Sequence, residues 1–266
     1  MACDLVSVIM PTFNECRFLV ESIESVLHQS YSNLELLITD DHSVNAQVRE
    51  ILTDYATRDA RVRVFFLEEN KGPGYARNNS IEQAKGRYIA FCDSDDRWAI
   101  DKLEKQVAFM KQTNACLSYT SYYRCNQSGK ITGVVEALKK MPFRTLKHDN
   151  KIGCLTAMYD TYVCGKRFMP SMRKRQDWAL FLSIVKEYGT AYGLTEPLAY
   201  YRNRKASVST KKCSLVKYNA MVYQKVLHYS VLKSYLYVLF VFMPVYGMKR
   251  IKYWWNNRLF SQTKES

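Results

Sequence analysis

The sequence predicts an α/β fold built on a parallel β-sheet, and two patterns carry this prediction. Short, continuously apolar and β-branched runs alternate with longer segments whose apolar residues recur at helical spacing. This alternation of strand and helix repeats from the N-terminus to about residue 92, an order typical of parallel strands joined by right-handed crossovers. The length of 266 residues suits one large domain, or one domain with an appendage.

The strands are predicted from apolar runs that end at a turn residue or an acid. Residues 5–10 (LVSVIM) form the first run, which Pro11 ends, and residues 34–39 form the second, which stops at Asp40-Asp41. The remaining strands are predicted at residues 62–67, 87–92, 117–124 and 198–201.

The helices are predicted where apolar side chains return every three or four residues. Residues 126–150 are instead turn-rich and basic, and are predicted to form a variable excursion. From about residue 213 onward we expect the chain to be helical. The other helices are predicted at residues 16–30, 48–55, 75–84, 101–112 and 178–188.

The net charge of +14 is concentrated at one end of the chain. Residues 1–200 carry 26 Lys/Arg and 24 acids, a balance of +2, whereas residues 201–266 carry 13 Lys/Arg and one acid, a balance of +12. The same 66 residues contain 13 aromatics. A basic, aromatic segment favours an anionic partner, either a nucleic acid or a membrane surface.

Residues 213–266 contain no nucleic-acid-binding motif, and their basic residues are spread out, so no nucleic acid is expected as a partner. The apolar run 234–248 contains Pro244 and is short for a transmembrane helix. Together with Trp254-Trp255 and the Lys/Arg residues, it favours an element at a membrane interface. Helices that pack on the domain and turn a basic face to solvent are the alternative.

The eight cysteines and the N-terminus both favour a cytoplasmic protein. No pair has C-x-x-C spacing and no Cys/His group has zinc spacing, so the cysteines are expected to be reduced and mostly buried. The N-terminus lacks a basic segment followed by an apolar stretch, so we expect no secretory signal.

Acidic residues follow three of the predicted strands: Glu15 follows the first, Asp40-Asp41 the second and Asp93 to Asp96 the fourth. Asp93-Ser94-Asp95-Asp96 comes directly after one strand, and two carboxylates one residue apart can share Mg²⁺ or Mn²⁺ with substrate phosphates. A helix N-cap is the alternative for such acids. Asp40-Asp41 follows another strand and suits a nucleotide's base or ribose, with an Asx-turn helped by Ser43 as the alternative. Since ligands bind at the carboxyl ends of parallel strands, we expect these acids to gather there.

Two common phosphate-binding motifs are missing. The sequence has no G-x-x-x-x-G-K-[ST] loop and no G-x-G-x-x-G after the first strand, which disfavours a P-loop ATPase and a dinucleotide dehydrogenase. Arg77 opens a helix after a Gly-rich turn. It could reach toward a nucleotide, or it could be a solvated surface residue.

Five collinear segments resemble the family 2 glycosyltransferases, inverting enzymes of the GT-A type. These segments lie at residues 6–15 (VSVIMPTFNE), 22–43, 70–98, 175–184 (RQDWALFLSI) and 197–209. The resemblance implies a GT-A three-layer α/β/α sandwich with a C-terminal helical extension. The catalytic domain would span residues 1–212, with a nucleotide-binding half at about 1–98 and an acceptor half at about 99–212, and the extension would span 213–266.

The resemblance also implies roles for individual residues. Asp93 and Asp95 would hold the divalent metal, and Asp177 would be the catalytic base that takes the proton of the attacking hydroxyl. Asp177 could also serve as the N-cap of its helix. The nucleotide-sugar site would consist of Pro11, Thr12, Asn14, Glu15, Asp40, Asp41, Arg77, Asp93, Ser94, Arg202 and Arg204.

This chain departs from the family pattern in two places. Gln176 precedes the base where the family usually has Glu, so a neighbouring negative charge is missing. Arg202-Asn203-Arg204 stands where relatives often carry Arg-x-His, and a solvated basic loop is the alternative to diphosphate binding there.

The function expected from these residues is transfer of a sugar from a nucleotide diphosphate, with UDP favoured, to a glycan or lipid-linked acceptor in surface polysaccharide synthesis. The protein would act in the cytoplasm, peripherally on the inner face of the bacterial inner membrane. One alternative is a sugar nucleotidyltransferase, although Pro11–Glu15 lacks the Gly-rich loop that it needs. The other is a catalytically degenerate, membrane-bound glycan-binding subunit, against which the retained acids argue.

Overall fold

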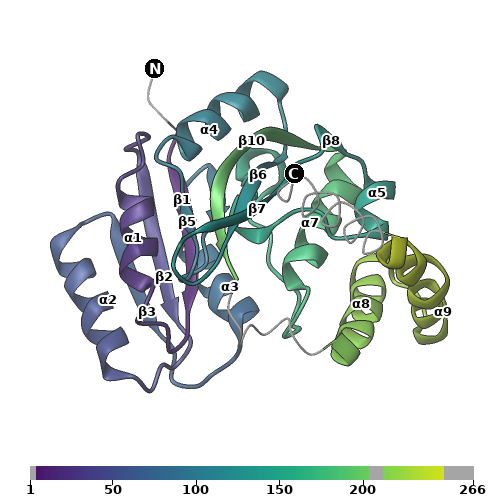
Figure 1. The fold of residues 1–266 in the computed structure, drawn as a ribbon, viewed down its shortest axis with the longest axis horizontal. Helices are drawn as coiled ribbons and strands as arrows, with labels where there is room; N and C mark the ends of the chain where they lie inside the picture. The colour runs from purple at the N-terminus through teal and green to yellow at the C-terminus, as the bar shows by residue number, and fades with distance from the viewer. Residues whose placement is uncertain (1–3, 204–211, 249–266) are drawn as a thin grey trace, which may run out of the picture.

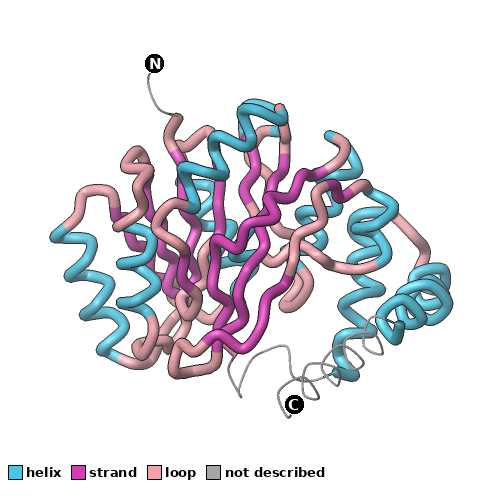
Figure 2. The backbone as a smooth tube through the Cα atoms, turned by 45° about the horizontal axis from the view of Figure 1, so that its top comes forward, coloured by secondary structure: helices cyan, strands magenta, loops and turns pink. Residues whose placement is uncertain are grey.

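A computed structural model describes residues 4–203 and 212–248 of the chain, and these form a mixed sheet with helices on both faces (Figures 1 and 2). The strand order is β3-β2-β1-β4-β9-β6-β10-β5, with β7 beside β6 and β8 beside β10. The first half is parallel, as the sequence predicts. It consists of β1 (Val6–Thr12), β2 (Leu34–Asp40), β3 (Val62–Phe66) and β4 (Tyr88–Phe91).

Strands β1, β2 and β4 are buried on both faces. Helices therefore cover both sides of the sheet, which gives the fold three layers. One apolar cluster joins the sheet to α1 (Leu19–Leu27), α2 (Ala46–Arg58) and α4 (Lys102–Thr113). The other cluster joins it to α3 (Pro73–Gln83) and α7 (Gln176–Tyr188). All five helices overlap the ranges that the sequence predicts.

The second half of the sheet departs most from the sequence prediction. The excursion expected at residues 126–150 instead pairs with the sheet through β7 and β8, and the strand expected at 198–201 is 12 residues long. Short strands whose pairing is antiparallel, such as β9, carry too few residues to show a period. The elements of this half are β5 (Arg97–Trp98), β6 (Leu117–Cys125), β7 (Ile131–Val135), β8 (Lys140–Met141), α5 (Phe143–His148), β9 (Met158–Asp160), α6 (Thr161–Cys164) and β10 (Ala191–Arg202).

Pro11 does not end the first strand, which continues to Thr12. The register explains why a proline is tolerated in this central strand. β4 pairs with β1 only as far as Ile9, so beyond that residue β1 has a partner strand on one side alone. The strand thus carries two more residues to the edge where the acids gather.

The C-terminal helices pack against α7, and the helical prediction from residue 213 is confirmed as far as Met248. They are α8 (Lys212–Leu227), α9 (Val231–Tyr237) and a π-helical turn (Val238–Phe242). The Trp178 ring lies 5.7 Å from the rings of both Tyr223 and Phe242. The boundary expected at residue 212 stays a prediction, although α8 and the turn share one apolar cluster with α7.

The six cysteines whose side chains the structure describes are free thiols, and four of these are buried.

Gly86, just before β4, lies very close to the backbone at the start of β1, and a substitution there tests this close approach. A Cβ at this position would lie 2.6 Å from the Ser7 backbone nitrogen and 2.8 Å from the Leu5 carbonyl oxygen, and neither backbone atom can move cheaply. Gly86→Ala should therefore lower the free energy of unfolding by about 2 kcal/mol or more in urea titration. Gly133→Ala in β7, where nothing lies within 4 Å, is the control and should change it by roughly 0.5 kcal/mol or less. Equal stabilities would contradict the register.

Lys102 tests the pH dependence of folding. Its side chain is fully buried, donates to Gln106 at 2.8 Å and lies 3.9 Å from the Trp98 ring, and burial lowers its pKa from 10.5 to about 7. Between these values the unfolded chain binds a proton that the folded chain does not, so the free energy of unfolding should rise with pH. Lys102→Met should remove this rise. At pH 7 the variant should have a higher free energy of unfolding than wild type, and urea titrations should show this difference shrinking as the pH rises. A constant difference would refute the prediction, and Lys111→Met controls for loss of an exposed lysine.

Candidate active site

The candidate site lies at the carboxyl edge of β1, β2 and β4, as expected for a parallel sheet. Thr12 and Asp40 are the last residues of β1 and β2, and Asp93–Asp96 follows β4. The N-terminal ends of α3 and α7 close the site from another side. The sequence correctly predicted that the acids follow these strands, although β1 ends at Thr12 and not before Pro11. It gave no sign that Gly74 in α3 and Gln176 in α7 would touch, where a Cβ on Gly74 would lie 3.2 Å from the Gln176 Cγ.

A buried ion pair joins α3 to the acidic loop, which consists of the residues Asp93–Asp96 after β4. Arg77 donates from Nη2 to Asp93 Oδ1 at 2.5 Å, and its side chain is only 7% exposed. Burial lowers the pKa of Arg77 but the charge of Asp93 raises it, and the net effect is upward. The Arg77 Nε has no partner. Arg77 is therefore a buried residue that holds Asp93, and not the solvated surface residue that the sequence also allowed; its contact with a nucleotide stays a prediction.

Asp177 lies in the first turn of α7 rather than at its N-cap. The helix begins one residue earlier, at Gln176, and the N-cap is Arg175 with a left-handed φ of 65°, so the capping alternative is wrong. A carboxylate in the first turn is stabilised by the helix dipole. Asn150 Nδ2 donates to Asp177 Oδ2 at 3.5 Å, and Trp178 anchors the turn by donating to the Leu146 carbonyl at 2.8 Å.

Cys154 lies beside the candidate site, and no motif in the sequence singles it out. It opens a short 3₁₀ turn and lies close enough to Arg77, Asp93 and Asp177 for all three charges to act on it. Burial raises the pKa of its thiol well above the usual value, with Arg77 opposing that shift. Asp177 of α7 and the acidic loop after β4 therefore both lie within electrostatic reach of Cys154.

The first loop is shaped by Asn14 and Glu15. Asn14 has a left-handed φ of 53°, and its Oδ1 accepts from the Val44 nitrogen at 2.9 Å, which ties this loop to the one after β2. Glu15 Oε1 accepts from the Phe18 nitrogen at 3.0 Å, beside the start of α1. The Thr12 hydroxyl is buried without a partner, and Pro11 precedes it in β1. These four predicted residues are brought together.

Asp40 and Asp41 are both buried and accept from their own surroundings. Asp40 accepts from the Ser43 nitrogen at 3.1 Å and from its hydroxyl, so the Asx-type turn that the sequence allowed is formed. Asp41 accepts from the Lys71 and Gly72 nitrogens at 2.8 Å each. Burial raises the pKa of Asp41, while these two donors oppose the shift. The pair fixes the loops around the site.

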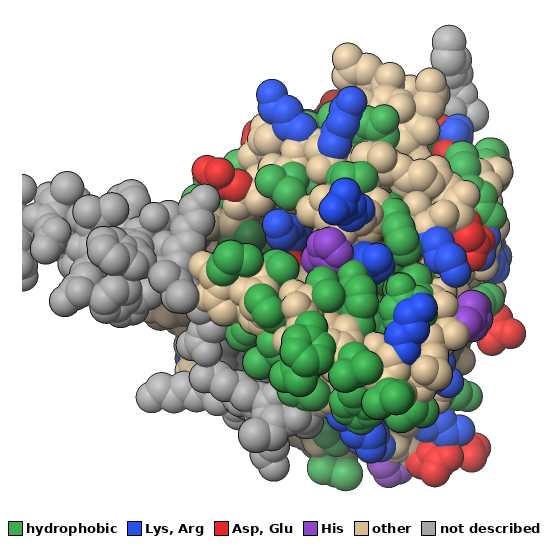
Figure 3. All heavy atoms as spheres, turned by 90° about the vertical axis from the view of Figure 1, so that its right-hand side faces the viewer, with side chains coloured by type: hydrophobic (Ala, Val, Ile, Leu, Met, Phe, Trp, Pro, Cys, Tyr) green, Lys and Arg blue, Asp and Glu red, His purple; other side chains and the backbone are tan. Residues whose placement is uncertain are grey.

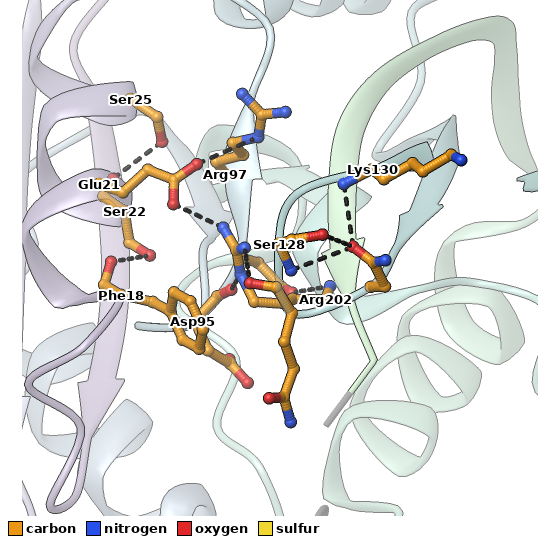
Figure 4. A network of polar contacts seen from close by, with 12 residues as sticks. Phe18, Glu21, Ser22, Ser25, Asp95, Arg97, Ser128, Lys130 and Arg202 are labelled. Carbon is orange, nitrogen blue, oxygen red and sulfur yellow. Dashed lines mark hydrogen bonds and ion pairs between the residues drawn. The ribbon is translucent and has the colours of Figure 1, made fainter. Parts of the chain in front are cut away.

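Arg202, at the end of β10, lies at the centre of a polar network beside the acidic loop (Figure 4). Its Nη2 donates to Glu21 Oε2 at 2.6 Å, its Nε donates to the Asp95 carbonyl at 3.1 Å, and its guanidinium lies 4.0 Å from the Phe18 ring. The backbone nitrogen of Arg202 donates to Asp96 at 2.9 Å.

The sequence predicted Arg202 near the diphosphate but missed Glu21, which looks like an ordinary exposed acid of α1. Arg204 lies outside the described residues.

The acidic loop offers two partly exposed carboxylates, Asp93 and Asp95, while Ser94 and Asp96 are buried. Within the described residues no three His, Cys, Asp or Glu side chains are grouped to hold a metal by themselves. Two hard oxygen ligands fit Mg²⁺ or Mn²⁺ that takes its other ligands from phosphates and water.

Comparison with known proteins agrees with this geometry. The profile of "Glycosyl transferase family 2" matches residues 7–171. The chain is 41% identical over 223 residues to the putative teichuronic acid biosynthesis glycosyltransferase TuaG of Bacillus subtilis, covering 84% of this chain and 88% of TuaG. It is 36% identical over 214 residues to the Escherichia coli UDP-Glc:alpha-D-GlcNAc-diphosphoundecaprenol beta-1,3-glucosyltransferase WfgD, covering 80% of this chain and 83% of WfgD.

Solved structures show the same fold. S. aureus TarS 1–349 in complex with UDP has a TM-score of 0.65 at 19% identity, covering 91% of this chain and 73% of TarS. The mannosyltransferase PcManGT from Pyrobaculum calidifontis, in complex with GDP-Man and Mn²⁺, has a TM-score of 0.62 at 16% identity, covering 88% and 69%. The expected GT-A sandwich with C-terminal helices is thus confirmed.

With acids collected at the strand ends of a GT-A sandwich, and with relatives of this similarity along most of its length, the chain belongs to glycosyl transferase family 2 and is a glycosyltransferase.

Proposed function

We propose that this glycosyltransferase is inverting and metal-dependent, with Asp177 as its base and Asp93 and Asp95 as metal ligands. The observation that carries the proposal is Arg77. It is buried, it pairs with Asp93, and the charge of Asp177 acts on it, so one cation in α3 holds the loop for the donor within electrostatic reach of the base. The donor would be a nucleotide sugar, with UDP favoured because WfgD is named for UDP-Glc and TarS was solved with UDP.

In an inverting transfer, the acceptor hydroxyl displaces the nucleotide diphosphate in one step. Asp177, in the first turn of α7, would accept the hydroxyl proton as the new C–O bond forms. A bound divalent cation supplies charge neutralisation for the departing diphosphate. Arg77 would keep Asp93 oriented toward the donor, and Arg202 would hold the backbone of the same loop through the Asp95 carbonyl.

The nucleotide would occupy the edge formed by Pro11, Thr12, Asp40 and Asp41. The partnerless Thr12 hydroxyl is buried there, and a ligand group would satisfy it. Asn14 and Glu15 would shape this pocket through the loop contacts they make, and the Ser94 and Arg204 assignments rest on the family motif alone. A sugar nucleotidyltransferase lacks support, because the loop after β1 is not Gly-rich. A degenerate binding subunit would have no need of Asp177 beside the acidic loop.

The acceptor would be a glycan or a lipid-linked precursor of a surface polysaccharide, on the cytoplasmic side of a membrane. TuaG and WfgD are named for teichuronic acid biosynthesis and for a diphosphoundecaprenol acceptor, which supports this class. Residues 213–266 would provide the membrane contact. A screen of UDP-, GDP- and dTDP-sugars for transfer or donor hydrolysis tests the donor directly, and no turnover with any of them would argue for the binding subunit.

Asp177→Asn tests the base. It keeps the shape of the side chain but cannot take the proton, so transfer should fall by roughly 100-fold or more while UDP binding is kept. The assay is sugar transfer at saturating donor, with UDP titrated by calorimetry. Glu187→Gln, in the last turn of the same helix, is the matched control and should keep full activity. Wild-type transfer by Asp177→Asn would exclude its role as base.

Asp95→Asn tests the metal site. The amide is a poorer ligand for a hard cation, so Mn²⁺-dependent UDP binding should weaken by roughly tenfold or more, while UDP binding without metal changes little. Calorimetric titrations with and without Mn²⁺ separate the two. Asp101→Asn, which removes an acid that bridges to Lys105 on α4, is the control. If Mn²⁺ strengthens UDP binding equally in Asp95→Asn and wild type, Asp95 is not a ligand.

A further inference from the structure

An apolar strip is exposed along α9 and the π-helical turn. Leu232 is 70% exposed, Leu239 57% and Phe240 69%, and Leu236 and Met243 continue the strip. Figure 3 shows apolar side chains gathered on this side of the molecule, with Lys and Arg side chains around them. A soluble helix usually turns its apolar side chains inward, so an exposed strip of this kind marks an interaction surface.

The opposite side of the same helix is packed on the enzyme. Ser234, Val238 and Phe242 are buried, and the Phe242 ring meets Trp178. The π-helical turn comes just before Pro244, whose ring and missing N–H disturb the helical ladder one turn earlier, and the wider turn absorbs this. The helix therefore carries two apolar sides, one fixed to α7 and α8 and one left outside.

This packing argues that the helix lies along a membrane and does not cross it. Val231–Met248 is apolar enough for a span, and 17% of that window is buried. A span would have to strip Val238 and Phe242 from the domain and expose the Trp178 cluster. Lying flat keeps both apolar sides covered.

Positive charge beside the strip points to an anionic surface. Lys233 lies on α9 itself, 4.1 Å above the Tyr229 ring, and Lys147 lies 5.1 Å from the ring of Tyr237. In the sequence, residues 249–266 add five Lys/Arg, one acid and Trp254-Trp255. Cations near an anionic bilayer each strengthen binding, and tryptophan favours the lipid–water interface.

We propose that the apolar strip of Leu232, Leu236, Leu239, Phe240 and Met243 inserts into the interface of an anionic lipid bilayer, so that α9 lies in the membrane plane. The inference rests on the proposed function only for its purpose, which is to bring a lipid-linked acceptor to the enzyme. Trp178, which contacts Phe242, directly follows Asp177, so the membrane helix would brace the turn that carries the base.

The double variant Leu239→Glu/Phe240→Glu tests the strip. Both side chains are exposed, so the fold should stay intact, as near-UV circular dichroism and UDP calorimetry can verify. In flotation with vesicles that contain phosphatidylglycerol, the variant should partition at least ~10-fold less than the full wild-type chain. Ile100→Glu, which is 66% exposed and lies before α4, is the matched control and should float like wild type. Wild-type flotation by the double variant would overturn the proposal.

Two further measurements distinguish binding to an anionic bilayer from self-association through the strip. Vesicles of phosphatidylcholine alone should capture wild type less well, and salt should weaken binding to the anionic vesicles, because the cations contribute. If wild type binds no vesicle and light scattering shows a dimer that the double variant breaks, the strip binds a second copy and the proposal is wrong.

The membrane proposal and the proposed activity can fail separately. Loss of flotation with normal transfer to a soluble acceptor would leave the proposed activity intact, whereas flotation without any transfer would refute only that activity.

Discussion

The buried ion pair between Arg77 and Asp93 is the constraint on which the candidate site depends. A guanidinium loses much hydration when it is 7% exposed, so it is tolerated only with a carboxylate in contact. Asp93 therefore fixes α3 against the loop after β4. Gly74, one turn earlier in α3, leaves room for Gln176 at the start of α7, which sets the place of Asp177. One pair of charges thus aligns two helices and a loop from distant parts of the sequence.

The sequence predicted the parallel half of the fold because continuous apolar strands and amphipathic helices each leave a local pattern. It did not predict β5, β8 and β9, since strands of two or three residues have no period and depend on partners elsewhere in the chain. Pro11 misled for a related reason. A proline ends a strand only where the neighbouring strand would accept a hydrogen bond from the missing N–H. β4 pairs with β1 only as far as Ile9, so β1 can continue through Pro11.

The candidate site shows the same division. Asp93, Asp95 and Asp40 could be found because each follows a strand that the sequence predicts, and strand ends converge at one edge. The contacts of Arg202 with Glu21 and Phe18 could not be found, because they join residues more than 180 positions apart in the chain. Cys154 was hidden for the same reason. Its neighbours Arg77, Asp93 and Asp177 come from three separate segments.

The charges at the site also bear on the distribution of charge along the chain. Asp93, Asp95, Asp96 and Asp177 lie around one edge with two buried guanidiniums, Arg77 and Arg202, and a nucleotide diphosphate would bring further negative charge. Arg77 is committed to Asp93, and Arg202 to Glu21 and the Asp95 carbonyl. A divalent cation held by Asp93 and Asp95 would offset that repulsion, which is the physical ground for proposing one. The +12 of residues 201–266 begins at Arg202, beside this edge, and continues in the sequence past the exposed strip of α9. Most of that positive charge therefore lies in the segment that we propose as the membrane contact.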